Sequence, residues 1–104
     1  MANDPFSVLA DPTRRRVLEL LSDRPHRAGE LASAAKTSAP VMSRHLRILL
    51  ESGFVADERV PDDARARVFR LRRKRISDVQ AWLDQLEAHW NEQLKSFKRH
   101  VEAK

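Results

Sequence analysis

The sequence predicts a single, mainly α-helical domain with a β-hairpin ahead of a long last helix, in the order α-α-α-α-β-β-α. Helix-start signals recur through the first half of the chain, where Asp-Pro pairs and a Ser precede periodic apolar segments. Two short segments of strand-forming residues then flank a turn-rich stretch, which predicts the hairpin. Beyond it, apolar residues recur every three or four positions to the end of the chain, as on one face of a helix.

The first two helices are predicted by Asp4-Pro5 and Asp11-Pro12, which each place a capping residue before a proline at the first helical position. We expect a short first helix, followed by a second one that ends before Pro25. The apolar residues that define them are Phe6, Leu9 and Ala10 in the first helix and Val17, Leu18 and Leu21 in the second.

A short third helix is predicted over residues 28–35, AGELASAA. Leu31 and Ala35 are expected to face inward. Its cap position holds Arg27, a poor capping residue, so this helix end is expected to fray.

A fourth helix is predicted to begin after Ser38, a good N-cap, with Pro40 in its first turn and Gly53 as its C-terminal stop. At about 100° per residue its apolar side chains share one face, which consists of Met42, Leu46, Leu49 and Leu50. The opposite face holds Pro40, Arg44, Arg47 and Glu51, and the flanks hold Ser43 and His45. The outward face therefore presents two arginines and little else that is bulky.

The hairpin is predicted from two strand-forming segments, residues 54–60 and 67–72, in the second of which Phe69 and Leu71 share one face. Residues 61–66, PDDARA, are rich in turn formers and are expected to form its tip. A basic run follows and consists of Arg70, Arg72, Arg73, Lys74 and Arg75.

The long last helix is expected to open at Ser77, because Ser77-Asp-Val-Gln80 matches a capping box. Its apolar stripe, with Trp82 beside it, consists of Ile76, Val79, Leu83, Leu86, Trp90, Leu94, Phe97 and Val101. Four short helices and one hairpin cannot cover so long a stripe, which predicts a two-fold interface, although packing on its own domain is the alternative.

The composition indicates one globular domain, residues 1–104, with a polyanion as partner. Hydrophobic residues make up 41% of the chain, and 20 Lys plus Arg against 15 Asp plus Glu give a net charge of +5. Such a balance favours nucleic acid, because Lys and Arg release counterions from phosphates. The chain has no cysteine, which excludes disulfides, thiolate metal sites and thiol redox chemistry.

The same sequence predicts neither an enzyme nor a membrane protein. Only two glycines are present, so no Gly-rich phosphate loop can form, and no spacing of Ser, His and Asp suggests a catalytic triad. No signal peptide and no apolar run of about 18 residues is recognisable. We therefore expect a cytoplasmic protein with no catalytic residues and no cofactor.

Two short helices, an amphipathic helix and a basic hairpin form the arrangement of a winged helix-turn-helix. An α-helix fits the major groove of B-DNA, where outward side chains reach base edges, and the hairpin can reach the flanking backbone or minor groove. The alternative is that the fourth helix is an ordinary surface helix whose arginines only keep it in solution.

The residues themselves resemble the ArsR-type transcriptional regulators over roughly residues 5–100. The similar segments are Asp11-Pro-Thr-Arg-Arg15 with Val17-Leu18, Gly29-Glu-Leu-Ala32, Ser38-Ala-Pro-Val-Met-Ser-Arg-His-Leu46, Gly53-Phe-Val55 and Arg67-Val-Phe-Arg-Leu71. The last helix, with Trp82, Leu83, Trp90 and Leu94, is similar to the metal-independent, cysteine-free branch. The resemblance implies a homodimeric repressor that binds a pseudo-palindromic operator in double-stranded DNA.

Two departures from the family pattern refine the expected contacts. Position 39 is Ala where many members have a polar residue, so part of the base readout is expected to be lost or moved. Asp62 and Asp63 at the hairpin tip repel phosphates, which places the wing contact on two arginines. The predicted DNA-binding residues are Ser38, Pro40, Ser43, Arg44, His45, Arg47, Arg65 and Arg67. The predicted dimer-interface residues are Phe6, Leu9, Leu83, Leu86, Trp90, Leu94 and Phe97.

The histidines of the last helix leave a second interpretation open. His89 and His100 share a helical face, and some family members bind zinc with a similar spacing on this helix. Here His89 lies too far beyond the hairpin to match that register, and residues 30–35 contain no metal ligand after the Glu-Leu pair. We expect no metal site, with a zinc-responsive repressor and a winged-helix module for protein interaction as alternatives. No small-molecule effector can be inferred from the sequence.

Overall fold

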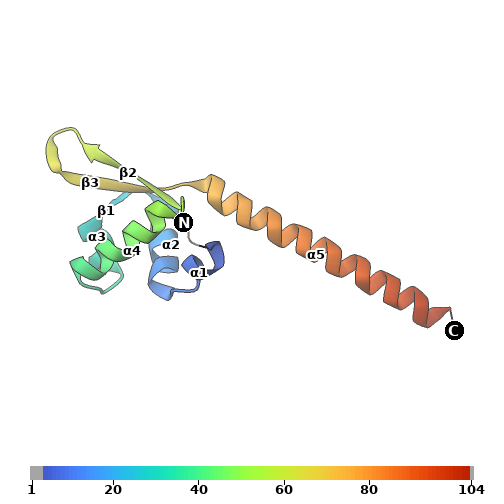
Figure 1. Ribbon diagram of the computed structural model, residues 1–104. Helices are drawn as coiled ribbons and strands as arrows, with labels where there is room; N and C mark the ends of the chain where they lie inside the picture. Colours follow the sequence, from blue (N-terminus) through green and yellow to red (C-terminus); the bar gives the residue numbers. More distant parts are fainter. Residues whose placement is uncertain (1–3, 104) are drawn as a thin grey trace.

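The computed structural model describes residues 4–103, including the backbone but not the side chains of Ala64 and Arg65. The elements run in the order α1 Pro5–Leu9, α2 Pro12–Asp23, β1 His26–Arg27, α3 Ala28–Ala34, α4 Ala39–Glu51, β2 Val55–Val60, β3 Asp63–Leu71 and α5 Arg73–Glu102 (Figure 1). The predicted fold class, mainly helical with a hairpin wing and a long last helix, is confirmed.

Two helix starts and one helix end form as the sequence predicts. The Asp11 carboxylate accepts hydrogen bonds from the N–H groups of Thr13 (2.8 Å) and Arg14 (3.2 Å) at the start of α2. The Ser38 hydroxyl accepts one from the N–H of Val41 (3.3 Å) at the start of α4. Gly53 follows α4 at φ +80°, a conformation that favours glycine. The side chain of Asp4, in contrast, caps no backbone N–H at the start of α1 and accepts instead from the Ser7 hydroxyl (3.4 Å).

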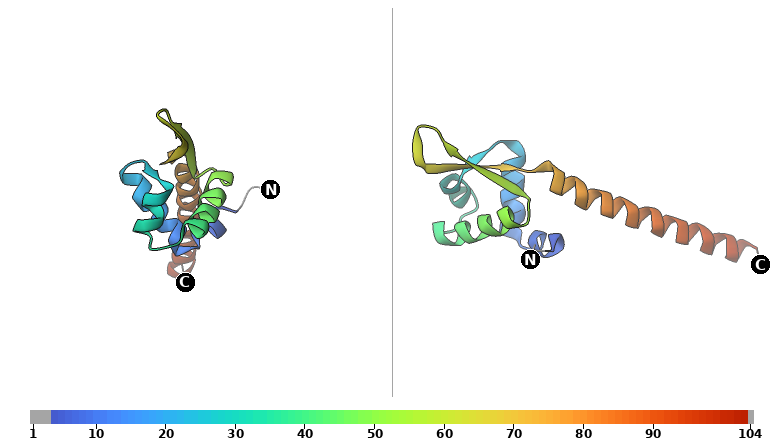
Figure 2. Two further views of the ribbon diagram at one scale, coloured as in Figure 1. Left: turned by 90° about the vertical axis from the view of Figure 1, so that its left-hand side faces the viewer. Right: turned by 45° about the horizontal axis from the view of Figure 1, so that its top comes forward.

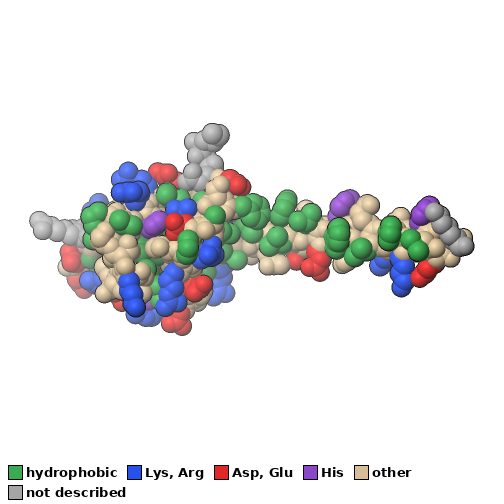
Figure 3. Space-filling model, turned by 90° about the horizontal axis from the view of Figure 1, so that it is seen from below, with side chains coloured by type: hydrophobic (Ala, Val, Ile, Leu, Met, Phe, Trp, Pro, Cys, Tyr) green, Lys and Arg blue, Asp and Glu red, His purple; other side chains and the backbone are tan. Residues whose placement is uncertain are grey.

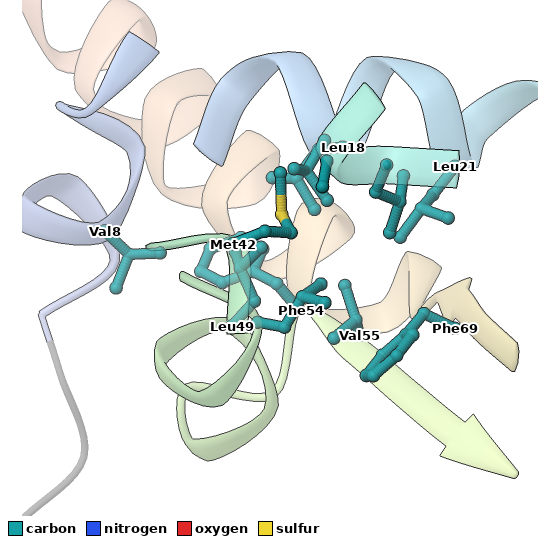
Figure 4. Close-up of a cluster of buried hydrophobic side chains, with 12 residues drawn as sticks. Val8, Leu18, Leu21, Met42, Leu49, Phe54, Val55 and Phe69 are labelled. Atoms are coloured by element: carbon teal, nitrogen blue, oxygen red, sulfur yellow. The ribbon is translucent and has the colours of Figure 1, made fainter. Parts of the chain in front are cut away.

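The hydrophobic core lies between α1–α4 and the base of the sheet (Figure 4). Its buried residues are Val8, Val17, Leu18, Leu21, Leu31, Ala32, Met42, Leu46, Leu49, Phe54, Val55 and Phe69. The inward face predicted for α4 is therefore confirmed, with Leu50 partly buried at its edge. Phe54, fully buried between α4 and β2, joins the helical part to the wing.

The sheet has three strands in the order β1-β3-β2, one more than predicted. His26 and Arg27 form β1 and pair with Phe69 and Val68 of β3. A two-residue strand has no alternation in sequence, so only its distant pairing partner reveals it. The expected hairpin tip over residues 61–66 is wrong, because β3 already begins at Asp63, paired with Val60 after an irregularity in the register.

The start of α3 is held in a way that the sequence analysis missed. The Glu30 carboxylate accepts a hydrogen bond from the N–H of Arg27 (3.0 Å), and Arg27 also lies in the sheet. These two contacts compensate for the poor cap, so the structure offers no support for the expected fraying.

The predicted start of the last helix at Ser77 is wrong. The helix α5 begins at Arg73, directly after β3, and its N-cap Arg72 provides no side-chain cap. The N–H of Arg72 donates instead to the carbonyl of Phe54 (2.8 Å), and the Arg75 guanidinium lies 5.8 Å from the centre of the Phe54 ring. These contacts at the end of the strand decide where the helix begins, and the capping-box motif does not.

The helix α5 projects away from the rest of the chain (Figures 1 and 2). The molecule measures 72 × 29 × 25 Å and has a radius of gyration of 19.2 Å. A compact domain of this length has a radius of gyration of about 13 Å. No residue of α5 is buried. A band of hydrophobic side chains follows the helix along its length (Figure 3), so the alternative in which α5 packs on its own domain is not what the structure shows.

Candidate DNA-binding surface

The helices α3 and α4 form the helix-turn-helix, joined by a short turn. In this turn Lys36 adopts φ +55°, and the N–H of Thr37 donates to the carbonyl of Ala32 (3.0 Å). The turn lets the inner face of α4 pack on the core while the other face points outward. The predicted side chains on that outer face are exposed, namely Ser38, Pro40, Ser43, Arg44 and Arg47.

A groove of about 550 Å³ lies between α4, the start of α3 and the wing. Three arginines from different elements line it: Arg27 of β1, Arg47 of α4 and Arg67 of β3. Ser43 faces the same groove from α4. Three guanidinium groups around one open groove favour a polyanion. The structure thus brings together two predicted arginines from helix and wing.

Arg27 is the site residue that the sequence analysis missed. From the sequence, Arg27 is predicted only to be a poor N-cap of the third helix. Its place in the groove results from the pairing of β1 with β3, which joins residues more than 40 positions apart in sequence. No local pattern around Arg27 could have indicated this position.

The wing arginines are partly neutralised by acidic neighbours. The guanidinium of Arg67 forms an ion pair with the Asp57 carboxylate (3.0 Å), and Arg70 forms one with Glu58 (3.5 Å). Arg67 stays more than half exposed in this pair. Arg59 is exposed and lies opposite Arg67 in the sheet register, which makes it a second wing candidate. The predicted contact of Arg65 lies outside the described side chains.

His45 is partly buried between α2 and α4. Its Nδ1 atom lies 3.2 Å from Nη1 of Arg14. Since a guanidinium is always a donor, we assign Nδ1 as the acceptor, which leaves Nε2 as the nitrogen free for a further contact. The Nδ1 atom of His45 thus has a structural role in the contact with Arg14. A DNA contact of His45 through Nε2 stays a prediction.

Arg14 and Arg15 of α2 connect α1 to the rest of the domain through hydrogen bonds to its backbone. Arg14 donates to the carbonyls of Val8 (2.8 Å) and Ser7 (3.2 Å), and Arg15 donates to those of Leu9 (2.8 Å) and Ala10 (3.0 Å). These bonds reach carbonyl groups at the end of α1, where a helix leaves carbonyls without donors of its own; that of Ser7 also accepts from the N–H of Ala10 (3.3 Å). Both arginines are therefore structural.

Two carboxyl groups that stabilise helix starts have lowered pKa values. Burial alone raises the pKa of Asp11, but hydrogen bonds from the N–H groups of Arg14 and Thr13 outweigh it and hold the pKa below the ordinary value of 3.8. The N–H of Arg27, followed by the Arg24 guanidinium, lowers the pKa of Glu30. Both groups are therefore charged at neutral pH and can act as helix caps.

The predicted dimer residues fall into two groups. Leu9 packs against the core and is partly buried, whereas Phe6 lies against α5, with its ring centre 5.0 Å from that of Trp82. The remaining five are exposed on α5: Leu83, Leu86, Trp90, Leu94 and Phe97. The structure therefore leaves the interface surface open, and its role in dimerisation stays a prediction.

His89 and His100 are both exposed on α5. Within residues 4–103, no three His, Asp or Glu side chains come close enough together to hold a metal ion. None of the described helices is both long enough and apolar enough to span a bilayer.

Comparison with known proteins identifies a helix-turn-helix domain in this part of the chain. A family model for a helix-turn-helix domain matches residues 9–58. The transcriptional repressor SdpR of Bacillus subtilis is 39% identical over 57 residues, which cover 55% of this chain but only 63% of SdpR. The HTH-type transcriptional regulator Rv2034 of Mycobacterium tuberculosis is 31% identical over 98 residues, 94% of this chain and 86% of that protein.

Solved structures show the same architecture. An ArsR family transcriptional regulator is 32% identical, with a TM-score of 0.75 over 83% of this chain and 91% of its own. An ArsR-like transcriptional regulator from Rhodococcus sp. RHA1 is 24% identical, with a TM-score of 0.85 over 95% of this chain and 88% of its own. The second match shares the fold over nearly the whole chain, so it extends into the long last helix.

Proposed function

The chain belongs to the ArsR family of winged helix-turn-helix transcriptional regulators, and from this membership we propose that it is a homodimeric repressor of a pseudo-palindromic operator. It is a DNA-binding regulator of transcription. Two copies bound to two half-sites block transcription by occupying DNA that the transcription machinery needs. The observation that supports this most strongly is the exposed arginine face of α4 beside the groove lined by Arg27, Arg47 and Arg67.

In this proposal α4 enters the major groove and reads bases. Arg44 lies near the middle of the exposed face, where a guanidinium can donate two hydrogen bonds to O6 and N7 of guanine. Ser43 and Arg47 follow the same face toward the wing. Ser38 caps the helix through its oxygen and still has a proton to donate to a phosphate near the helix start.

The wing and β1 hold the phosphate backbone. Arg67 and the neighbouring Arg59 contact the backbone or the minor groove beside the half-site, together with Arg65 as predicted from sequence. Arg27 contacts a phosphate across the groove from Arg67. Because Asp57 pairs with Arg67, the phosphate has to compete with this carboxylate, so Arg67 contributes less than an unpaired arginine.

Dimerisation is proposed on the apolar surface of α5. Nine side chains of α1 and α5 are each 38–67% exposed, namely Phe6, Ile76, Trp82, Leu83, Leu86, Trp90, Leu94, Phe97 and Val101. They expose on the order of 800 Å² in one chain, given that a buried aromatic side chain covers about 150–250 Å². Two such surfaces bury roughly 1,600 Å² together, which is the size of a stable specific interface.

The proposal includes three further expectations. The regulator works in the cytoplasm, where a chromosomal operator lies. It performs no catalysis, and its DNA affinity does not depend on zinc. The two alternatives from the sequence, a zinc-responsive repressor and a module for protein interaction, differ from it in these properties.

Selection of fragments from the source genome by the immobilised protein tests this function. We expect a small set of fragments that share an inverted repeat, and binding to them that is at least about a thousandfold tighter than to scrambled duplexes. Equal retention of all fragments, or retention of none, would contradict a sequence-specific repressor.

A further inference from the structure

The guanidinium of Arg14 is held in place by the end of α1. Its Nε atom donates to the carbonyl of Val8 (2.8 Å), and its Nη2 atom donates to the carbonyl of Ser7 (3.2 Å). The side chain of Val8 is buried in the core, with 1% of its surface exposed, so the backbone that accepts these bonds is itself held. Because a guanidinium is planar and rigid, two held nitrogens also fix the direction of the third.

The third nitrogen of Arg14 contacts α4. Its Nη1 atom lies 3.2 Å from Nδ1 of His45, and both side chains are partly buried. Arginine has no acceptor, so this bond requires an Nδ1 atom without a proton, and a neutral imidazole then carries its proton on Nε2. The hydrogen bond of one ring nitrogen commonly sets the tautomer of a histidine in this way. The contact with Arg14 therefore selects one tautomer and one orientation of the ring.

The Nε2 atom of His45 is available for a contact with DNA. Within residues 4–103 it makes no hydrogen bond. At about 100° per residue, His45 lies on the flank of the exposed face of α4 that is next to α2, whereas Ser43 lies on the opposite flank, at the groove. Phosphates border the major groove on both sides of an inserted helix, so a donor on this flank is within reach of the DNA.

We propose that Arg14 is a positioning residue for DNA binding: held by α1, it fixes the Nε2–H group of His45 as a donor to a hydrogen-bond acceptor of the DNA. This inference rests on the proposed DNA-binding function and adds to it a residue that does not itself touch the DNA. The acceptor is a phosphate oxygen or an acceptor atom on a base edge, since both accept from an N–H group. The bonds of Arg14 to α1 thus also serve the DNA-binding surface of α4.

Arg15 offers a matched control for the purely structural effect of losing Arg14. It is exposed, and its Nη1 atom donates to the carbonyls of Leu9 (2.8 Å) and Ala10 (3.0 Å) at the same end of α1. The structure places His45 next to Arg14 and not next to Arg15. R15A therefore removes the same charge and two bonds to α1, but it leaves the contact with His45 in place.

A double-mutant cycle of R14A and H45A tests whether Arg14 acts through His45. Fluorescence anisotropy measures the affinity of each variant for a duplex recovered by the genomic selection and for a scrambled duplex. We expect H45A to lose about 5- to 10-fold on the recovered duplex, which corresponds to about one hydrogen bond. R14A should lose about 3- to 5-fold, because the ring can still donate but is no longer held. The double variant should bind within about twofold of H45A, and R15A within about twofold of the natural chain.

Nitrogen NMR of the imidazole rings, in the chain without DNA, reads the tautomer directly. Protonated and unprotonated ring nitrogens differ in chemical shift, and the signals of His45 are those missing from H45A. At about pH 8, where an ordinary histidine is neutral, the natural chain and R15A should carry the proton of His45 on Nε2 alone. R14A should show a mixture of the two tautomers. A purely structural role of Arg14 would not produce this difference from R15A.

The DNA measurements also identify the acceptor. An equal loss of H45A on both duplexes assigns it to a phosphate, and a loss confined to the recovered duplex assigns it to a base edge; each supports the proposal. Losses of R14A and H45A that multiply in the double variant, an H45A variant that binds like the natural chain, or a natural chain with an unprotonated Nε2 would overturn it and leave the DNA-binding function standing. A natural chain that binds neither duplex would remove that function, and the role of Arg14 with it.

Discussion

Replacing Trp90 by alanine should break the proposed dimer without unfolding the chain. Trp90 is 61% exposed, so roughly 150 Å² of a side chain of about 250 Å² is left for a partner to cover. At about 25 cal/mol per Å², that area corresponds to about 3–4 kcal/mol. Alanine keeps a part of this contact and association has its own entropic cost, so we expect a loss of about 2–3 kcal/mol per chain. A dimer contains two copies, and its dissociation constant should rise by at least about a thousandfold.

Sedimentation equilibrium over a concentration series measures this change directly. The K95A variant is the matched control, because Lys95 is exposed on α5 away from the stripe and should leave the dissociation constant within about threefold. Circular dichroism should show an intact winged-helix part in W90A, since Trp90 belongs to no part of the core. If W90A remains dimeric at the concentration where the natural chain does, the stripe is not the interface and the estimate from exposed area fails.

Three further predictions follow from the same structure. Chelator or added zinc should change operator affinity by less than about tenfold, or about 1.4 kcal/mol of coupling, and a larger change in a gel-shift titration would restore the zinc-sensor alternative for His89 and His100. The D11A variant should lose about 0.5–2 kcal/mol of unfolding free energy at pH 7. The pKa of Asp11 is lowered in the folded chain. The contribution of its carboxylate to the free energy of unfolding is therefore fully present above pH 3.8, and it is lost as the pH falls through the lower pKa of the folded chain. D11N keeps the cap and should therefore flatten this acid dependence in denaturant titrations, and an unchanged acid slope would contradict the assignment. R67A should weaken operator and scrambled DNA alike and reduce the salt dependence by less than about one charge, since Asp57 already pairs with Arg67; a loss confined to the operator would show that the wing reads sequence.

Local signals in the sequence predict most of the helical part. Asp11, Ser38 and Gly53 act at their helix ends as their side chains or backbone preferences require. The period of the apolar residues identifies the buried face of α4 and, by difference, its exposed arginines. The same period identifies the stripe on α5, whose exposure in the structure follows from its length.

Local sequence signals do not predict the features that depend on contacts between residues far apart in the sequence. The strand β1 exists only because β3 passes beside it, and Arg27 enters the groove through that pairing. The ion pair of Arg67 with Asp57 depends on the diagonal register of two strands. The start of α5 was misplaced for the same reason, since contacts of Arg72 and Arg75 with Phe54 override the local capping motif at Ser77.

The comparison of R44A with the natural chain, on operator and on scrambled duplexes, tests most directly whether α4 reads the sequence. R99A, which removes the same charge from the outer side of α5, is the control. We expect R44A to lose about 1–3 kcal/mol on the operator and little on scrambled DNA, so that the ratio of the two affinities falls by roughly 5- to 150-fold. R99A should leave that ratio unchanged. An unchanged ratio in R44A would show that α4 is not the reading helix.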